Sequence, residues 1–223
     1  MMGEQLPFDQ FAQEYDEWFT DHQLIFMSEL NAVRVFIPRT GKGVDIGSGT
    51  GRFVLPLHVA HAIDPSFPAL KIAKSRGISV VSAVAEALPF RSSSFDYAVM
   101  VTSICFFYDA KQALIEARRV LTYSGNLIIG FIDRDSFLGK LYERKRFTSR
   151  FYRHAHFYTA NELISILRAT GFGYFEYKQT IFDLAEAEYP VLDGFGKGGF
   201  VVVNTRKTGT KKRAALFEIH RPG

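Results

Sequence analysis

A short apolar strand that runs directly into three alternating glycines constrains this chain more than any other feature. The strand covers Val44–Ile46, and the glycines are Gly47, Gly49 and Gly51. Glycine adopts a positive φ at little cost, and without a side chain it allows a ligand to lie against the backbone. Asp45, two residues before the first glycine, can hydrogen-bond such a ligand. The pattern therefore predicts a strand and a turn of an α/β fold, followed by a helix, with a ligand site at the turn.

The spacing of the glycines separates two kinds of cofactor. A dinucleotide fingerprint, G-x-G-x-x-G, ends on a glycine that lets the helix pack closely on the strand. Here that position is Arg52, and the third glycine falls one residue earlier. G-x-G-x-G with a preceding acid resembles motif I of the class I S-adenosylmethionine-dependent methyltransferases. Taken alone, the motif also fits a tight turn with no ligand.

Strand and helix patterns alternate along most of the chain, which favours a parallel sheet with right-handed crossovers. We predict an α/β, Rossmann-like sheet of seven mostly parallel strands with helices on both faces. The expected strands are 44–46, 59–63, 79–82, 95–101, 127–132, 172–180 and 200–204. The expected helices are 7–37, 50–58, 65–76, 110–120 and 159–171, the last opened by a capping box at Thr159 and Glu162.

Ligands of such sheets bind outside the carboxyl ends of the strands. Asp64 lies at the end of the second expected strand and can accept both hydroxyls of a ribose, although an aspartate there can also cap the next helix. Thr102 follows the fourth expected strand, so its backbone faces the same crevice. Asp109, also after that strand, is interpreted as a cap for the helix that begins at Ala110.

Three further segments resemble the small-molecule, type 11 class I methyltransferases. They are Ala85–Phe90 with Ser94–Asp96, Arg119–Leu121 with Ser124-Gly125, and Tyr15-Asp16-x-Trp18-Phe19. The resemblance covers about residues 8–130 and 159–171. It implies S-adenosylmethionine as cofactor and an amino-terminal helix that folds over it. The cofactor-binding residues that we expect are Tyr15, Asp45, Gly47, Ser48, Gly49, Gly51, Asp64, Pro65, Ser66, Val84, Ala85, Glu86 and Thr102.

One position departs from that family. Its members usually carry an aspartate immediately before the Ala-Glu pair, where the carboxylate accepts the adenine amino group, and this chain has Val84. Losing one hydrogen bond to a neutral amine costs about 1 kcal/mol, so we expect weaker binding rather than none.

Residues 132–158 form an aromatic and basic insertion outside the resemblance. Eight aromatic residues lie between Phe131 and Tyr158, together with seven Lys or Arg and three acids. We interpret the segment as a lid over an acceptor pocket, with a satellite core as the alternative. His154, His156 and Tyr158 are weak candidates for a general base, which methyl transfer needs only when the acceptor arrives protonated. No spacing of His, Cys or Asp suggests a metal site.

Composition limits the remaining classes. A chain of 223 residues with one cysteine, Cys105, fits a single domain (1–223) in a reducing cytoplasm, and we expect no membrane segment. Residues 1–40 would form a helical cap, and residues 205–223 a basic tail. With a net charge of +4, nucleic-acid binding is not favoured. The resemblance to the type 11 methyltransferases implies a small-molecule acceptor as the partner. The alternative functions are a nicotinamide-dependent oxidoreductase and a non-catalytic S-adenosylmethionine-binding module; the oligomeric state stays open.

Overall fold

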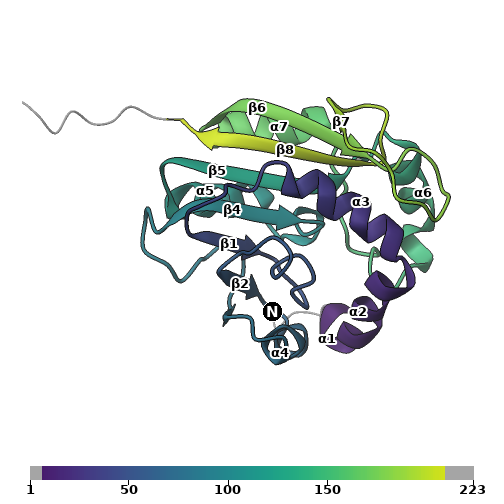
Figure 1. Cartoon of the computed structure of the whole chain (residues 1–223), viewed down its shortest axis with the longest axis horizontal. Helices are drawn as coiled ribbons and strands as arrows, with labels where there is room; N and C mark the ends of the chain where they lie inside the picture. The colour runs from purple at the N-terminus through teal and green to yellow at the C-terminus, as the bar shows by residue number, and fades with distance from the viewer. Residues whose placement is uncertain (1–6, 209–223) are drawn as a thin grey trace, which may run out of the picture.

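Eight strands form one mixed sheet in the computed structural model, which describes residues 7–208 (Figure 1). The strands are β1 (Gly43–Ile46), β2 (His61–Asp64), β3 (Val80–Ser82), β4 (Phe95–Val101), β5 (Leu121–Ile132), β6 (Phe172–Thr180), β7 (Leu192–Asp193) and β8 (Phe200–Lys207). Their order across the sheet is β3-β2-β1-β4-β5-β8-β6-β7. The pairs from β3 to β5 are parallel, and the pairs that involve β8, β6 and β7 are antiparallel.

The α/β fold is confirmed, but the expected seven strands are one too few among the described residues. The additional strand, β7, is a pair of exposed residues with no apolar alternation to predict it. In addition, β5 begins at Leu121, directly after a helix, and the expected turn at 124–126 falls where its register with β4 shifts. The strand order reverses beside β1, which places a ligand crevice at its carboxyl end.

Helices cover both faces of this sheet (Figure 1). They are α1 (Pro7–Gln10), α2 (Ala12–Asp21), α3 (Gln23–Arg34), α4 (Phe67–Ser75), α5 (Ala110–Val120), α6 (Phe137–Lys145) and α7 (Ala160–Ala169), with short 3₁₀ turns at Ile104–Phe106 and Arg146–Thr148. The predicted helix 110–120 agrees with α5, which Asp109 caps by accepting from the Gln112 N–H. The capping box at Thr159 and Glu162 opens α7 as expected.

Alternating side chains of the central strands build two apolar layers. On β4, Ala98 and Met100 join the layer under α5 and α7, whereas Val99 and Val101 join the layer under α3. Each fully buried aliphatic side chain contributes about 1.5–3 kcal/mol. Because both faces of β4 are covered, its sequence is a continuous apolar run, as expected of a central strand.

The amino-terminal segment is not the single helix predicted over 7–37. It is divided into α1, α2 and α3, with non-helical backbone at Phe11 and His22. Neither break is a proline or glycine, and the apolar periodicity continues through both, so the sequence gives no signal that a helix stops there. The break at His22 allows α2 to lie beside α4 while α3 crosses the sheet (Figure 1).

The helix expected over 50–58 is also wrong. Residues 52–58 form a series of turns, and β2 begins at His61 rather than at residue 59. Pro56 has no N–H to donate to a helical hydrogen bond, and His58 adopts a φ of 55°. Phe53, Val54 and Leu57 are nevertheless buried, so the apolar pattern reported burial correctly but not helix.

The insertion 132–158 contains α6 and the 3₁₀ turn after it. Its rings pack on one another: Tyr142 stacks on Tyr152 at a centroid distance of 4.8 Å, and Phe157 lies 5.6 Å from Tyr152. Both tyrosines pack against the layer under α3. The basic residues 211–213 of the predicted tail lie outside the described residues.

Candidate active site

A cavity of about 190 Å³ opens at the carboxyl ends of β1, β2, β3 and β4. Ten of the thirteen expected cofactor-binding residues line it, and Asp45, Ser48 and Gly51 do not. The structure thus brings together residues that are up to 100 positions apart in the sequence, from Phe8 to Tyr108. The lining residues are Phe8, Tyr15, Gly47, Gly49, Asp64, Pro65, Ser66, Ala83, Val84, Ala85, Glu86, Val101, Thr102, Ser103, Phe106, Phe107 and Tyr108.

The three glycines of the turn have different surroundings, although all have positive φ. Gly47 and Gly49 face the cavity, and a Cβ on Gly47 would lie 2.5 Å from the Cβ of Ser103. Gly51 instead packs against Ala73 of α4 and against Ile78, three residues beyond the end of that helix: an added Cβ would lie 2.4 Å from Ile78 Cδ1. Two glycines therefore shape the ligand surface, and the third permits close packing beneath it.

Two aspartates lie beside the glycine turn, and Asp64 lines the cavity whereas Asp45 does not. Asp64 accepts hydrogen bonds from the N–H groups of Gly49 and Ser66, both at 2.8 Å. Burial raises its pKa to about 6 although these two bonds lower it. Asp45 is 2% exposed, and its Oδ1 has no hydrogen-bond partner among the described residues. Burial, and then the charge of Asp64, raise the pKa of Asp45 to about 8.

The loop after β3 forms the opposite wall. Val84 is 47% exposed at the cavity, while Ala85 is buried. The Glu86 carboxylate accepts from the Asp109 N–H at 3.1 Å, which ties this wall to the start of α5. Further along, Arg119 donates to the carbonyls of Phe90 and Leu88 at 2.6 and 2.8 Å. Two of the segments that carry the family resemblance, Ala85–Phe90 and Arg119–Leu121, are thus hydrogen-bonded to each other.

Thr102 and Tyr15 close the end of the cavity beyond β4. Thr102 adopts a φ of 51°, which is uncommon for a β-branched residue and marks a backbone fixed by its surroundings. Burial raises the pKa of Tyr15, and its side chain is hydrogen-bonded to Thr102. Tyr15 comes from α2, so an amino-terminal helix does border the cavity.

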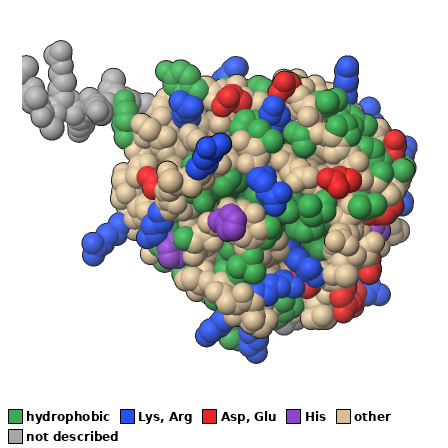
Figure 2. All heavy atoms as spheres, viewed as in Figure 1, with side chains coloured by type: hydrophobic (Ala, Val, Ile, Leu, Met, Phe, Trp, Pro, Cys, Tyr) green, Lys and Arg blue, Asp and Glu red, His purple; other side chains and the backbone are tan. Residues whose placement is uncertain are grey.

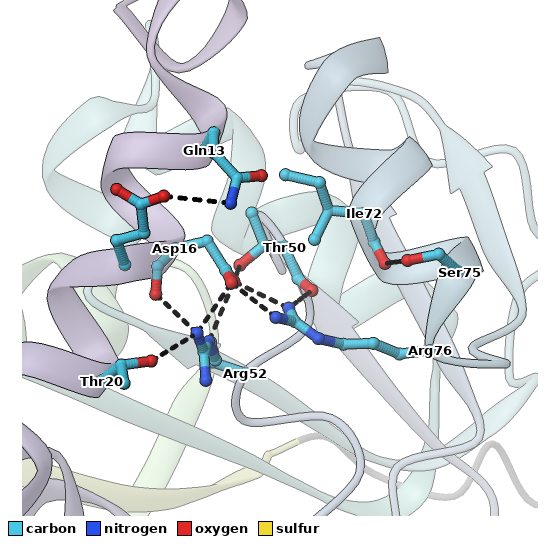
Figure 3. Close-up of polar contacts among 9 residues, drawn as sticks. Gln13, Asp16, Thr20, Thr50, Arg52, Ile72, Ser75 and Arg76 are labelled. Atoms are coloured by element: carbon cyan, nitrogen blue, oxygen red, sulfur yellow. Dashed lines mark hydrogen bonds and ion pairs between the residues drawn. The ribbon is translucent and has the colours of Figure 1, made fainter.

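A buried ion cluster fastens α2 to the glycine turn (Figure 3). The Asp16 carboxylate accepts from Arg52 and Arg76 through both of its oxygens, at 2.5–2.9 Å, and from the Thr50 hydroxyl at 2.5 Å. Arg76 also donates to the Thr50 carbonyl at 2.6 Å. Burial alone would raise the pKa of Asp16, but the bonds from Arg76, Arg52 and Thr50 outweigh it and hold the pKa at about 2. Arg52, at the third-glycine position of a dinucleotide fingerprint, is thus a structural anchor.

A second cavity of about 200 Å³ adjoins the first, and Tyr15 and Thr102 line both. Its walls come from α2, α3, β5 and the insertion 132–158. They are aromatic apart from two acids, one threonine and one isoleucine: Glu14, Tyr15, Trp18, Phe19, Glu29, Thr102, Ile132, Tyr142, Phe151 and Tyr152.

The candidate bases lie outside both of these cavities. His154 and His156 are exposed, and His156 lies on an open surface groove beside α7. Tyr158 is half-buried and, with Thr102, lines a small gap of about 10 Å³. Among the described residues no group of three or more His, Cys, Asp or Glu could hold a metal ion.

Sequence reasoning did not assign the aromatic part of the first cavity. Phe8, Phe106, Phe107 and Tyr108 line it, and Phe8 lies 5.0 Å from Tyr15 and 4.9 Å from Phe106 in edge-to-face contacts. The apolar run after β4 reads as core, and only the position of residues 106–108 at a strand's carboxyl end could have identified them.

A crevice at the switch in strand order, with a glycine turn and an acid after β2, defines an α/β protein that binds a nucleoside cofactor. A family model described as a methyltransferase domain matches residues 44–129. A Thermotoga maritima structure, described as a SAM-dependent methyltransferase and possible histamine N-methyltransferase, is 43% identical with a TM-score of 0.88. The similarity covers 91% of this chain and 99% of that one.

Two other comparisons extend this result. An uncharacterized protein of Methanocaldococcus jannaschii is 43% identical over 202 residues, which is 90% of this chain and 98% of that protein. A chain in a Haloferax volcanii complex, described as the Trm112 methyltransferase activator with the putative methyltransferase, has a TM-score of 0.70 over 93% of this chain and 100% of that one. Its identity of 14% shows a shared fold only. The chain therefore belongs to the class I S-adenosylmethionine-dependent methyltransferases, and S-adenosylmethionine is its cofactor.

Proposed function

We propose that this enzyme methylates a nitrogen, oxygen or carbon nucleophile of a small molecule that enters the second cavity. The observation that carries this proposal is that the two cavities share Tyr15 and Thr102. One cavity has the glycine turn and the ribose-type acid, and the other has aromatic walls. A donor in the first and an acceptor in the second would meet at these two residues.

The residues of the first cavity fit the cofactor. Positive φ at Gly47 and Gly49 leaves backbone open to a ligand, and Asp64 can accept ribose hydroxyls at the end of β2. Asp45 Oδ1 and Ser48 Oγ, buried without partners among the described residues, offer unused hydrogen-bonding capacity beneath the turn. Val84 and Ala85 would contact the adenine, with no carboxylate for its amino group.

The bound cofactor supplies an electrophilic methyl group on a sulfonium. The protein needs to align an acceptor with that group and exclude water, and well-oriented reactants gain several orders of magnitude in rate. Tyr15, held by Thr102 and by the Asp16 cluster of the same helix, is placed to fix the acceptor side. We assign no general base to His154 or His156, because both are exposed and outside the two cavities.

Several observations favour a small acceptor over a nucleic acid. The basic insertion is partly neutralised within the fold, since Arg134, Arg146 and Arg150 pair with Glu162, Glu143 and Glu14. On the face drawn in Figure 2, basic and acidic side chains are interspersed. The description of the Thermotoga maritima protein as a possible histamine N-methyltransferase also points to a small acceptor. We further propose that residues 132–158 cover the acceptor, and that the reaction takes place in the cytoplasm.

No helix in residues 7–208 is both long and apolar enough to cross a membrane. Fractionation of cells that produce the protein tests the proposed cytoplasmic location.

Calorimetric titration with S-adenosylhomocysteine tests the donor site. We expect binding by the native chain and none by Val84→Trp, because the larger side chain would occupy the cavity that Val84 lines. Val84 is half-exposed, so the variant should keep the native melting temperature. A native chain that ignores the ligand at about 1 mM would refute the proposal. Tight binding without methyl transfer to a broad acceptor panel would favour the non-catalytic alternative.

A further inference from the structure

Glu29 is the one group in the second cavity whose presence the fold does not explain. It lies in the middle of α3 and is only 4% exposed. Among residues 7–208 no hydrogen bond or ion pair to its carboxylate is found, and burial is the only cause that raises its pKa, to about 8. A buried carboxylate without a partner destabilises the folded state, so such groups persist mainly where a ligand uses them.

Asp16 shows how the same molecule treats an acid that serves structure. It is 5% exposed, as deeply buried as Glu29, but it accepts from two guanidinium groups and a hydroxyl. Glu29 has no such partners and faces a cavity instead. The described residues that line this cavity include no Lys or Arg, and its second acid, Glu14, is exposed and paired with Arg150. The carboxylate of Glu29, once ionised, therefore makes the cavity suit a cation.

Aromatic rings surround the same space. Trp18, Tyr15 and Phe151 line it from one side, with Tyr15 and Phe151 at a centroid distance of 5.8 Å. Tyr142 and Tyr152 line it as a stacked pair from the insertion. The face of an aromatic ring attracts an organic ammonium, and several rings around one carboxylate form an arrangement that recognises amines.

We propose that the second cavity binds a small protonated amine, with its ammonium group at Glu29 and its organic part against the rings. This inference rests on the proposed function, because it makes the amine the methyl acceptor. The amine would extend from Glu29 toward Tyr15 and Thr102, where the two cavities meet. The ammonium has no lone pair, so a second nucleophilic atom at the other end of the molecule takes the methyl group from the sulfonium. S-adenosylhomocysteine is the leaving group, and a proton lost from that atom goes to solvent. Glu29 is then the residue that selects amines over neutral molecules of the same shape.

The test compares amines with their neutral counterparts in the presence of S-adenosylhomocysteine. Calorimetry is run with 2-phenylethylamine, histamine and 1,4-diaminobutane, and with 2-phenylethanol, imidazole-4-ethanol and 1,4-butanediol. We expect at least one amine to bind ~10-fold or more tightly than its alcohol, and Glu29→Gln to remove that preference. The proposal is overturned if no amine exceeds its alcohol at about 10 mM, or if Glu29→Gln keeps the preference.

Glu14→Gln is the matched control. It removes the same charge from the same cavity, but Glu14 is exposed and already paired with Arg150 at 3.0 Å. We expect this variant to bind amines nearly as well as the native chain. Equal losses in both variants would mean that overall charge, not Glu29, sets the preference, and would count against the proposal.

Two more measurements separate this inference from a structural role and from the proposed function. Since Glu29 has no partner, Glu29→Gln should melt at or above the native temperature, whereas loss of a structural acid would lower it. The cavity's other titratable groups are Glu14, Tyr15, Tyr142 and Tyr152. Amine affinity should rise between pH 6 and 8 in the native chain, as Glu29 ionises, and stay flat in Glu29→Gln. Failure to bind S-adenosylhomocysteine would instead count against the donor site.

Discussion

Removing the charge of Asp16 tests whether the ion cluster in Figure 3 holds the amino-terminal helices on the cofactor turn. Asp16→Asn keeps the shape of the side chain but leaves Arg52 and Arg76 facing each other without a counter-ion. The fall of the Asp16 pKa from 3.8 to about 2 corresponds to about 2 kcal/mol of stability at neutral pH. Breaking a fully buried pair costs about 3–5 kcal/mol, but both guanidiniums are 25% exposed and regain some water. We expect a loss of about 2–3 kcal/mol.

For a chain of this size, that loss lowers the melting temperature by about 5–10 °C. Urea unfolding at several pH values gives a sharper test. An aspartate with a depressed pKa stabilises the fold above its unfolded pKa of 3.8 and loses that contribution as the pH falls toward about 2. The stability difference between the native chain and Asp16→Asn should therefore be full at pH 7 and shrink between pH 4 and pH 2.

Asp21→Asn is the control, because Asp21 is exposed at the end of the same helix. We expect it to change stability by less than about 0.5 kcal/mol. Asp16→Asn should also weaken S-adenosylhomocysteine binding, since Tyr15 on α2 lines the donor cavity. If Asp16→Asn unfolds within about 0.5 kcal/mol of the native chain at pH 7, the cluster does not anchor α2 and the reasoning fails.

Three other predictions concern the donor site. Val84→Asp should tighten S-adenosylhomocysteine binding several-fold by calorimetry, as one hydrogen bond is worth about 1 kcal/mol; unchanged affinity would place the adenine elsewhere. Because the pKa of Asp45 is raised to about 8, the cofactor-free native chain should lose stability as the pH rises from about 4 to 8. Urea unfolding of Asp45→Asn should show a stability that depends less on pH. An identical pH dependence in the two proteins would contradict the raised pKa. Gly51→Ala should cost about 2 kcal/mol or more, since its Cβ would meet Ile78 at 2.4 Å, whereas Gly77→Ala, with similar φ but open space, should cost only about 1 kcal/mol; equal losses would deny the packing role.

The sequence predicts correctly those parts of the fold in which the local sequence pattern and the tertiary packing favour the same secondary structure. The ends of β4, α5 and β6 match the expected residues, because a buried run or a capped amphipathic helix carries its own boundary signals. The failures at 7–37 and 50–58 have another origin. There the apolar spacing reports burial, and backbone conformation at His22 and His58 is decided by what the segments pack against.

The same distinction applies to the site. Loops at strand ends are predictable, because a parallel sheet brings them together whatever their side chains are. The spacing of the glycines predicts a cofactor contact for Gly51, but its contact with Ile78 depends on the position of the end of α4 in the fold. In the sequence, Arg52 indicates only that the dinucleotide fingerprint lacks its third glycine. Its partner Asp16 is 36 residues away, and no local pattern connects them.

Glu29 marks the limit of sequence reasoning in this protein. In the sequence it is a glutamate on a helix that covers a sheet, and such residues normally face water. It lies in a cavity whose walls also come from α2 and, with Tyr142 and Tyr152, from the insertion, so that segments more than 100 residues apart surround it. Most of the donor cavity is lined by short loops at strand ends, each of which is a local stretch of sequence. The proposed acceptor cavity is lined by segments that lie far apart in the sequence, so its contacts can change while the glycine turn stays the same.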